Sequence, residues 1–597
     1  MCGISGIFFT KGKPEELKEA IEKMNQVQGR RGPDDEGIFI DVGSGLAFGH
    51  RRLAILDLSK AGHQPMARIN KDNAEFWITY NGEIYNFLEL KKDLEKKGCQ
   101  FKTQTDTEVV LALYAEYGEK SFSMLRGMFA FGLWDGGKKK LFLVKDRYGI
   151  KPLYYCNDNG KSIFASTVEA IAKSGLIAIQ KNSEAFIGFL LFGSVPLPMT
   201  TIKNVFAVPA GHYLEIDAAN KIKLVQYYDF LNFYRPKVVE NSPQSASLEI
   251  RRLLEESVNF HQISDAPLGV FLSGGLDSSA IAALVARNRE KPITTLSVVF
   301  DEKEFSEEYY SDLVAQKIGS DHRKIKITKQ DFYGSFEEIF EAMDQPTVDG
   351  VNTFFIAKAA KSAGLKTVLS GLGSDEIFCG YPSFGKAAMI RKIQNLPKFL
   401  KPSLGLMSLV DGRYQKLNYL KNNDILSFYL GIRGLFVPQE AAKILDADLS
   451  EVNNFLKNLS IFQSFNLSIF QLPPVDLLSY LELKFYLQNQ LLKDTDFMSM
   501  RHSVETRVPF LDHKLVEYVS GLPPELKLNK KLNKSLLVEA VRDLLPPEIF
   551  ARPKMGFTFP FQKWLKEGDR FNIQHSTFNK SHWSRFWANL VLDKFKQ

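Results

Sequence analysis

The sequence changes its pattern once, between about residues 215 and 245, and this change constrains the fold more than any other feature. Before it, short β-rich runs such as 75–80 and 140–144 alternate with glycine-rich turns around two helical patterns, 14–27 and 108–117. Strands and helices interleaved in this way predict a layered α/β domain built on antiparallel sheet. A polar stretch, 235–244, is typical of a linker.

After the linker, strands and helices alternate one by one. The predicted strands are 267–272, 294–300, 323–327 and 366–369, and the predicted helices are 246–263, 279–289, 307–318 and 354–363. This alternation predicts a parallel, doubly wound sheet. Beyond Tyr381 we expect a mostly helical chain. The domains are therefore predicted at 1–215 and 245–597, with 216–244 as the linker.

Composition excludes several classes of partner. The net charge of +7 is mild for 597 residues, and no segment concentrates Lys and Arg among aromatic residues, so we expect no nucleic-acid partner. No apolar run approaches the ~18 residues that a membrane-spanning helix needs. The four cysteines are scattered without a CxxC pair, which favours a reducing compartment. We therefore expect a cytoplasmic protein without a membrane partner.

Cys2 directly follows the initiator methionine. If the methionine is removed, the thiol lies beside a free α-amine, whose ordinary pKa is about 7.7–8.0. That amine can accept the thiol proton, so one residue supplies both nucleophile and base. Position alone also allows a structural cysteine, and the rest of the chain must decide.

Residues 269–279 read GVFLSGGLDSS, which predicts a buried strand, a glycine-rich turn and a serine-rich helix start. Glycines let the backbone approach a ligand, and the free N–H groups with the helix dipole form an anion site. The loop is not a Walker A motif, because the required Gly-Lys-Ser/Thr is missing.

A second acidic turn, SGLGSDE at 370–376, follows another predicted strand. Asp277 and Asp375 would then lie at the carboxyl ends of neighbouring strands and suit Mg²⁺, which binds a few carboxylates together with phosphate oxygens. Either aspartate alone is also a common helix cap.

Ordered motifs along nearly the whole chain resemble the glutamine-dependent asparagine synthetase family, B type. In the first half these are MCGISG (1–6), RGPD (31–34), HRRL (50–53), QPM (64–66), NGEIYN (81–86), TDTE (105–108), GMFAF (127–131) and DRYGIKPLYY (146–155). In the second half they are SGGLDSS (273–279), DQP (344–346), SGLGSDE with CGY (379–381), ETRVPFLD (505–512) and RPKMGF (552–557). SGGLDSS itself is similar to the pyrophosphate-binding loop of ATP pyrophosphatases. The resemblance implies an αββα N-terminal-nucleophile (Ntn) hydrolase glutaminase domain, followed by a doubly wound ATP-pyrophosphatase domain with a helical extension.

For the first domain, the resemblance implies that Cys2 attacks the glutamine amide and forms a thioester while ammonia leaves. The Asn81 side chain and the Gly82 N–H would form the oxyanion hole, Arg52 would bind the α-carboxylate, and Asp106 the α-ammonium. An internal ion pair is the structural alternative for Arg52 and Asp106. The expected glutamine contacts are Arg52, Asn81, Glu83 and Asp106.

For the second domain, the resemblance implies that ATP activates the aspartate β-carboxylate as an acyl-adenylate, and that ammonia then displaces AMP. Lys554 falls where the family has a lysine that neutralises developing charge. Mg²⁺ would bind Asp277 and Asp375. The expected ATP contacts are Leu272, Ser273, Gly274, Gly275, Asp277, Ser278, Val299, Ser370, Gly371 and Gly373.

Two departures from the family pattern bear on function. Many members have Glu where this chain has Leu372, which leaves the general base at this position in doubt. It also keeps open an amidotransferase of the same architecture that acts on another carboxylate, such as a uronic acid in surface-polysaccharide assembly. The common HRGPD string begins with Arg30 here. A non-catalytic relative is disfavoured, because Cys2, Asp277, Asp375 and Lys554 are all present.

We expect ammonia to cross between the two sites through an internal channel, since free ammonia would be protonated and diluted in water. The expected partners are small-molecule substrates: glutamine, ATP, and aspartate or another carboxylate. A homodimer is possible, because no sequence feature indicates the oligomeric state.

Overall fold

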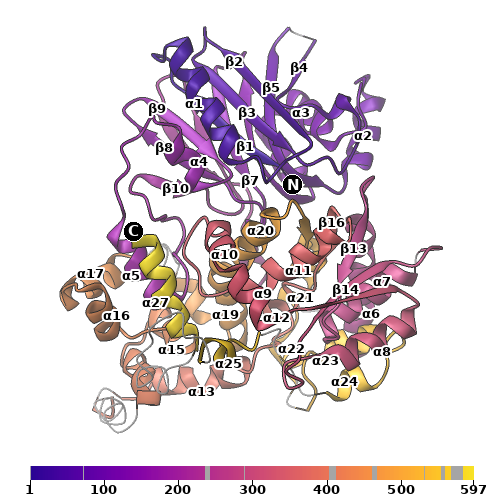
Figure 1. The fold of residues 1–597 in the computed structure, drawn as a ribbon, viewed down its shortest axis with the longest axis vertical. Helices are drawn as coiled ribbons and strands as arrows, with labels where there is room; N and C mark the ends of the chain where they lie inside the picture. The colour runs from indigo at the N-terminus through magenta and orange to yellow at the C-terminus, as the bar shows by residue number, and fades with distance from the viewer. Residues whose placement is uncertain are drawn as a thin grey trace.

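The computed structural model describes residues 2–71, 73–234, 242–287, 289–397, 399–401, 412–459, 467–529, 531–552, 555, 559–566 and 583–596. Figure 1 shows a sheet sandwich formed by the first part of the chain, above a larger part in which helices surround a second type of sheet. Below, these are called the N-terminal and the C-terminal domain.

Two six-stranded antiparallel sheets form the N-terminal domain. In spatial order, the first contains β10 (Val205–Ala207), β8 (Tyr154–Asp158), β9 (Lys161–Ala165), β1 (Gly3–Phe8), β3 (Leu46–Arg52) and β2 (Asp35–Asp41). The second contains β12 (Ile222–Gln226), β11 (His212–Ile216), β7 (Lys140–Lys145), β6 (Gly127–Asp135), β5 (Glu75–Ile84) and β4 (Met66–Ile69).

Helices cover the outer face of each sheet. α1 (Pro14–Val27) and α4 (Val168–Lys173) pack on the first sheet, and α2 (Phe87–Lys96) and α3 (Asp106–Tyr117) on the second. α1 buries Leu17, Ile21 and Met24, a spacing that places them on one helix face. The inner faces of the sheets share a core that includes Phe8, Phe48 and Trp134. The predicted αββα layering is confirmed.

The structure corrects the predicted end of this domain. β12 pairs with β11 from His212↔Gln226 to Ile216↔Ile222, so the sheet continues into the segment predicted as linker, 216–244. β12 lies at the sheet edge and three of its five residues are exposed, so its mixed polar composition gives no clear strand pattern. α5 (Ser183–Phe192), within the predicted first domain, instead buries Phe186 and Phe189 in the core of the C-terminal domain.

The C-terminal domain is built on a five-stranded parallel sheet. Its spatial order is β15 (Asp321–Lys326), β14 (Thr294–Val299), β13 (Leu268–Phe271), β16 (Thr367–Leu369) and β17 (Glu505–Arg507). α6 (Pro243–His261) precedes the first of these strands, and the helices between the strands include α7 (Leu276–Arg287), α8 (Glu308–Ile318) and α11 (Val351–Ser362). The four predicted strands are confirmed. The described chain beyond Tyr381 is mostly helical, as predicted, and β17 is the one strand there that was not predicted. Its three residues are too few to show an alternating pattern, and its partner strand is distant in sequence.

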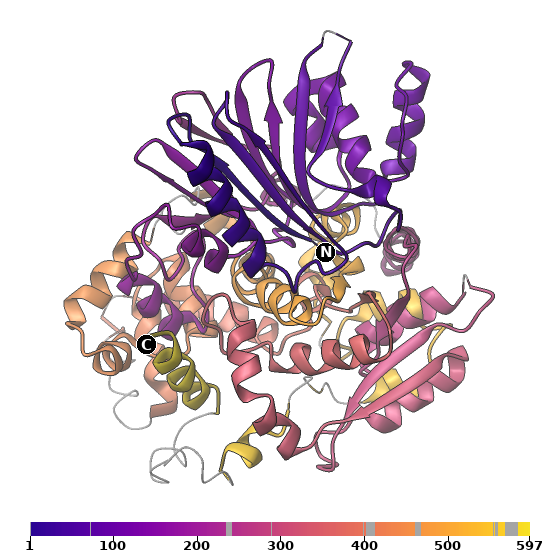
Figure 2. The same ribbon diagram turned by 45° about the horizontal axis from the view of Figure 1, so that its top comes forward.

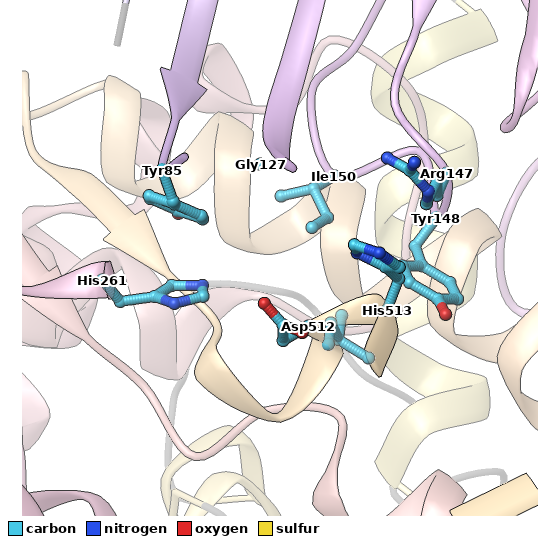
Figure 3. A pocket seen from close by; sticks show the side chains of 9 residues that line it. Tyr85, Gly127, Arg147, Tyr148, Ile150, His261, Asp512 and His513 are labelled. Carbon is cyan, nitrogen blue, oxygen red and sulfur yellow. The ribbon is translucent and has the colours of Figure 1, made fainter. Parts of the chain in front are cut away.

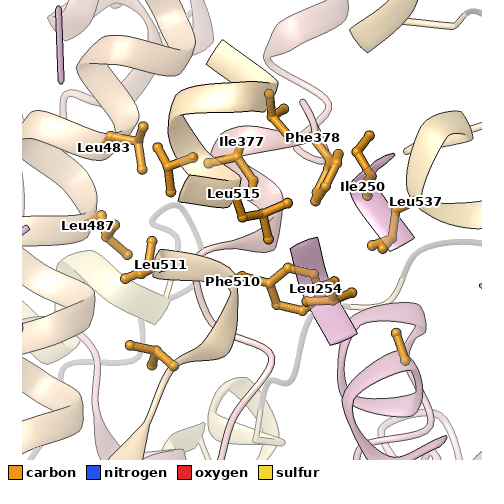
Figure 4. Close-up of a cluster of buried hydrophobic side chains, with 14 of the residues drawn as sticks. Ile250, Leu254, Ile377, Phe378, Leu483, Leu487, Phe510, Leu511, Leu515 and Leu537 are labelled. Atoms are coloured by element: carbon orange, nitrogen blue, oxygen red, sulfur yellow. The ribbon is translucent and has the colours of Figure 1, made fainter. Parts of the chain in front are cut away.

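A large apolar core fixes the helices around this sheet (Figure 4). It joins α6, α12 (Ser374–Ile377), α19 (Pro474–Leu481), the π-helical segment η6 (Glu482–Leu491), α21 (His513–Ser520) and α23 (Ser535–Val541). Leu254, Leu483 and Leu515 are fully buried there, and each such side chain contributes about 1.5–3 kcal/mol. α20 (Leu492–Met500) continues from η6 toward the N-terminal domain (Figure 2).

The remaining described elements are mostly short helices. They are η1 (Lys60–Gly62), η2 (Gly118–Met124), η3 (Phe230–Phe233), α9 (Lys329–Gly334), α10 (Phe336–Ala342), α13 (Phe384–Gln394), η4 (Gly412–Lys421), α15 (Ile425–Arg433), α16 (Pro438–Leu445), α17 (Leu449–Asn458), η5 (Leu467–Gln471), η7 (Pro509–Leu511), α22 (Pro524–Lys527), α24 (Glu548–Ala551), α25 (Phe561–Lys566) and α27 (Trp583–Lys596). None of the helices in the described ranges is long and apolar enough to cross a membrane.

Candidate active sites

Cys2 is buried. The N-terminal end of the drawn chain lies where the sandwich faces the C-terminal domain (Figures 1 and 2). Its backbone N–H donates to Asn81 Oδ1 at 2.9 Å, and Arg31 Nε donates to the Cys2 carbonyl at 3.2 Å. Arg31 Nη1 also pairs with Asp496 Oδ2 of α20 at 2.7 Å. Two residues of the N-terminal domain therefore hold the Cys2 backbone, and the C-terminal domain contacts one of them, Arg31.

Burial raises the pKa of the Cys2 thiol above its ordinary value, so the resting thiol is neutral and needs a base. Beside it, Asn81 is fully buried, and its Nδ2 has no hydrogen-bond partner among the described residues. Leaving such a donor unpaired is costly unless a ligand completes it. At Gly82 a Cβ atom would lie 2.2 Å from the Met128 carbonyl oxygen, so only glycine fits.

Backbone carbonyls hold the Arg52 guanidinium. It donates to the carbonyls of Ser59 at 2.8 Å and Asp57 at 2.5 Å, both in the loop after β3. A Cβ on Gly62 would lie 2.0 Å from Arg52 Nη2, so this glycine makes room for the side chain. Arg52 and Asp106 do not pair with each other, and the substrate contacts predicted for them stay predictions.

Asp106 is the first residue of α3, and the Thr105 side chain caps this helix. Asp106 Oδ2 accepts hydrogen bonds from the Tyr80 hydroxyl at 2.7 Å and from the Ile84 N–H at 2.8 Å. Burial outweighs these bonds and raises the pKa of Asp106 to about 6. Two hydrogen bonds thus fix the carboxylate in place, and its raised pKa means that it is protonated more easily than an exposed aspartate.

Glu83 instead contacts the other domain. Its Oε1 lies 3.4 Å from Arg507 Nη2 of β17, and Arg507 also pairs with Glu505 at 2.6 Å. Burial raises the pKa of Glu83 well above its ordinary value. The glutamine contact of Glu83 stays a prediction. Arg507 and Asp496 had no role predicted from sequence, although Arg507 lies within the ETRVPFLD string.

Several other motif residues serve the same domain interface. Asp344 of the DQP string accepts hydrogen bonds from the N–H groups of Val168 at 2.9 Å and Glu169 at 3.0 Å, and so caps α4 of the N-terminal domain. Asp34 of the RGPD string pairs with Lys366 at 2.8 Å. These two motifs therefore contribute contacts between the domains, which is a structural role separate from substrate binding.

A small cavity also lies between the domains (Figure 3). It leaves room for about one water molecule. Its lining residues are Tyr85, Gly127, Arg147, Tyr148, Ile150, His261, Leu511, Asp512 and His513.

The first predicted phosphate loop runs from β13 into α7, and hydrogen bonds of its own serines order it. Ser278 Oγ accepts from the Ser273 N–H at 3.2 Å and donates to the Gly275 carbonyl at 3.2 Å. Gly274 has a φ of +74°, which favours glycine, and a Cβ there would lie 2.6 Å from Ser311 N. The loop therefore packs closely against the start of α8.

The second phosphate loop follows β16, the neighbour of β13, and the two loops touch. Ser374 Oγ donates to Asp277 Oδ1 at 2.8 Å. The structure thus brings most of the predicted ATP-binding residues to one edge of the sheet, and Val299 ends β14 on the other side of β13. These residues are Leu272, Ser273, Gly274, Gly275, Asp277, Ser278, Ser370, Gly371 and Gly373.

Lys534 completes this site and was not predicted. Its Nζ lies 2.6 Å from Asp277 Oδ1 and 2.6 Å from Asp375 Oδ1. No motif marks it, because it follows a polar stretch far along the chain. The predicted Lys554 lies outside the described residues. Arg552, two positions earlier, donates to the Gly274 carbonyl at 2.9 Å and pairs with Glu307.

Comparisons with known proteins agree with this arrangement. A family model described as a glutamine amidotransferase domain matches residues 1–228, and one described as asparagine synthase matches residues 249–594. Glutamine-hydrolyzing asparagine synthetase 1 of Bacillus subtilis is 33% identical, covering 95% of this chain and 88% of the relative. Asparagine synthetase 3 of the same organism is 30% identical, covering 95% of this chain and 89% of the relative. Amidase chry2 of Gibberella zeae is 28% identical, covering 94% of this chain and 90% of the relative.

The fold and the two sites define a class of enzyme: an Ntn-type glutamine amidotransferase domain joined to an ATP-dependent carbon–nitrogen ligase domain. Within that class, the chain belongs to the asparagine synthase family.

Proposed function

We propose that this enzyme transfers the amide nitrogen of glutamine to the side chain of aspartate, forming asparagine, glutamate, AMP and pyrophosphate. The observation that carries the proposal is the pairing of two sites in one chain of this family. One has a buried thiol beside the unpartnered Asn81 Nδ2, and the other has two carboxylates on adjoining phosphate loops.

In the N-terminal domain, removal of Met1 would turn the Cys2 nitrogen into the α-amine that takes the thiol proton. The thiolate attacks the glutamine amide, and the oxyanion accepts hydrogen bonds from Asn81 Nδ2 and the Gly82 N–H, about 2.7–4 kcal/mol per donor. Arg52 binds the α-carboxylate and Asp106 the α-ammonium. Ammonia leaves, and water hydrolyses the thioester to glutamate.

In the C-terminal domain, the Ser273–Ser278 loop and the start of α7 bind the phosphates of ATP. The aspartate β-carboxylate attacks the α-phosphorus, pyrophosphate leaves, and ammonia then displaces AMP from the acyl-adenylate. Lys554 would neutralise charge on the phosphate and the acyl intermediate.

Asp277 and Asp375 fit a divalent cation, because both carboxylates already face one cation, the Lys534 ammonium. Mg²⁺ on this pair would shield the charge of the phosphates.

An internal ammonia channel is part of the proposal. The burial of Cys2 at the domain interface supports it, since ammonia released there faces the C-terminal domain. A Cys2→Ala variant should give no amide with glutamine as the only nitrogen donor. Amide yield per ATP equal to wild type under that condition would exclude the channel.

A second acceptor remains a candidate. Leu372 is half-buried against the apolar core where many family members have Glu, and a relative of similar length is named an amidase. Both observations favour a different acceptor pocket with the same nitrogen and ATP chemistry. The candidate acceptor is another carboxylate, such as that of a uronic acid.

Product analysis distinguishes the two acceptors. Purified enzyme is incubated with aspartate, ATP, Mg²⁺ and amide-¹⁵N glutamine, and products are identified by mass spectrometry. We expect ¹⁵N-asparagine, AMP and pyrophosphate in equal amounts. Glutamate formation without asparagine would overturn aspartate as the acceptor. The intact mass of the protein reports whether Met1 has been removed.

A further inference from the structure

Lys534 joins the two phosphate loops through one buried ammonium. Its Nζ lies 2.6 and 2.7 Å from the two carboxylate oxygens of Asp277, and 2.6 Å from Asp375 Oδ1. Ser374 Oγ is a further contact at 3.2 Å. Carboxylates from both loops therefore share a single positive charge.

The three side chains differ in exposure. Lys534 is 4% exposed, whereas Asp277 is 25% and Asp375 is 20% exposed. The lysine thus closes the inner side of the pair, while the carboxylates keep an edge accessible to solvent. A divalent ion that arrives with a triphosphate can approach from that edge.

The surrounding backbone is shaped around this contact. Lys534 has a φ of +51°, a left-handed conformation that non-glycine residues rarely adopt and that costs free energy. At Gly380 a Cβ would lie 2.2 Å from Lys534 Cε and 1.9 Å from Asp375 Oδ1, so a larger residue would displace the pair. Asn533 Nδ2 also donates to the Gly380 carbonyl at 3.2 Å.

The charges of these three groups leave a net charge of −1. Two partly buried carboxylates without the lysine would carry −2 and attract a divalent cation by themselves. We propose that Lys534 is a fixed cation of the ATP site. It holds the loops together before ATP binds, and it weakens metal binding so that the divalent ion enters only with the triphosphate. This inference rests on the proposed function and makes Lys534 a positioning residue.

The test uses Mn²⁺ as a probe on the full chain, without nucleotide, and measures free Mn²⁺ by electron paramagnetic resonance. Lys534→Met should bind Mn²⁺ at least about tenfold more tightly than wild type, because the local charge becomes −2. Its melting temperature should fall by roughly 5 °C or more in EDTA and rise again with Mn²⁺. Lys531→Met, at an exposed position of the same segment, is the matched control and should match wild type in both measurements.

The double variant K534M/D375N restores the net charge of −1 and should bind Mn²⁺ as weakly as wild type. It carries the test if K534M alone is not recovered folded. Equal Mn²⁺ affinity and equal melting in wild type and K534M would overturn the proposal. So would a double variant that is unfolded or as sensitive to metal as K534M. These measurements use no acceptor, so a failure of asparagine formation by wild type would overturn the proposed function separately.

Discussion

The proposed glutamine site and the proposed phosphate site neutralise their buried charges in different ways. In the glutamine site, Arg31 pairs with Asp496 and Glu83 with Arg507, and both partners come from the C-terminal domain. In the phosphate site, Asp277 and Asp375 pair with Lys534 of their own domain. Because a buried charge without a partner is strongly destabilising, the glutamine site depends on domain contact and the phosphate site does not.

The largest effect should come from Cys2→Ala. Without the thiol no thioester forms, so we expect the glutaminase rate to fall by roughly 10⁴-fold or more. Ammonia-dependent pyrophosphate release should stay within about twofold of wild type, because the phosphate site keeps its own charges. Both rates are measured, with Cys99→Ser, a partly exposed cysteine, as the control. Glutaminase activity retained in Cys2→Ala would show that Cys2 is not the nucleophile.

Asn81→Asp sharpens the comparison within the glutamine site. The substitution keeps the Oδ1 acceptor for the Cys2 nitrogen but removes the Nδ2 donor. We expect glutaminase kcat to fall by about 10²–10³-fold, with a smaller change in KM. Steady-state kinetics with glutamine measures this, and ammonia-dependent synthesis should be unchanged. A change in KM with an unchanged kcat would show that Asn81 does not contact the oxyanion.

Asp496→Leu tests the dependence on domain contact. It leaves the Arg31 guanidinium buried without its partner, which should cost about 3–5 kcal/mol in unfolding free energy. Glutaminase kcat/KM should also fall, by about tenfold, although Asp496 lies in the other domain. Chemical denaturation and glutaminase kinetics are the measurements.

Glu341→Gln is the control for this experiment, because its pair with Arg501 has an exposed carboxylate and should be worth at most about 1 kcal/mol. The variant Arg31→Met/Asp496→Leu should be less destabilised than the sum of its single changes. Unchanged glutaminase activity in Asp496→Leu would contradict the comparison.

The smallest effect is a pH dependence at Asp106. With its pKa raised to about 6, the carboxyl is ionised at pH 7 and mostly protonated at pH 5, where it no longer attracts an ammonium. The KM for glutamine should therefore rise about tenfold from pH 7 to pH 5. Asp106→Asn should have a high KM that does not change over this range. A wild-type KM that is flat would exclude Asp106 as the ammonium ligand.

The raised pKa of Asp106 also makes the stability of the folded state depend on pH. Because folding raises the pKa of Asp106 above its ordinary value of 3.8, its contribution favours the folded state at pH below about 4 and is lost as pH rises through about 6. Thermal unfolding of wild type and Asp106→Asn across this range should converge at low pH.

Local patterns were sufficient for much of the fold. The helix α1 and the strands β13, β14 and β16 lie where periodicity and glycine turns predicted them, since these signals involve neighbouring residues. β12 and β17 were missed because an edge strand and a three-residue strand are defined mainly by their partners. α5 shows the same limit: its sequence indicates burial but not which domain provides the core.

The sequence by itself determined the two glycine-rich loops and their convergence, because parallel strands bring their carboxyl ends to one edge, and it predicted Cys2 as the nucleophile. Only the tertiary structure decided which charges meet. Lys534 lies 257 residues from Asp277 along the chain, and Arg31 lies 465 residues from Asp496. A buried charge requires a partner, but packing selects that partner, and no local pattern records the choice.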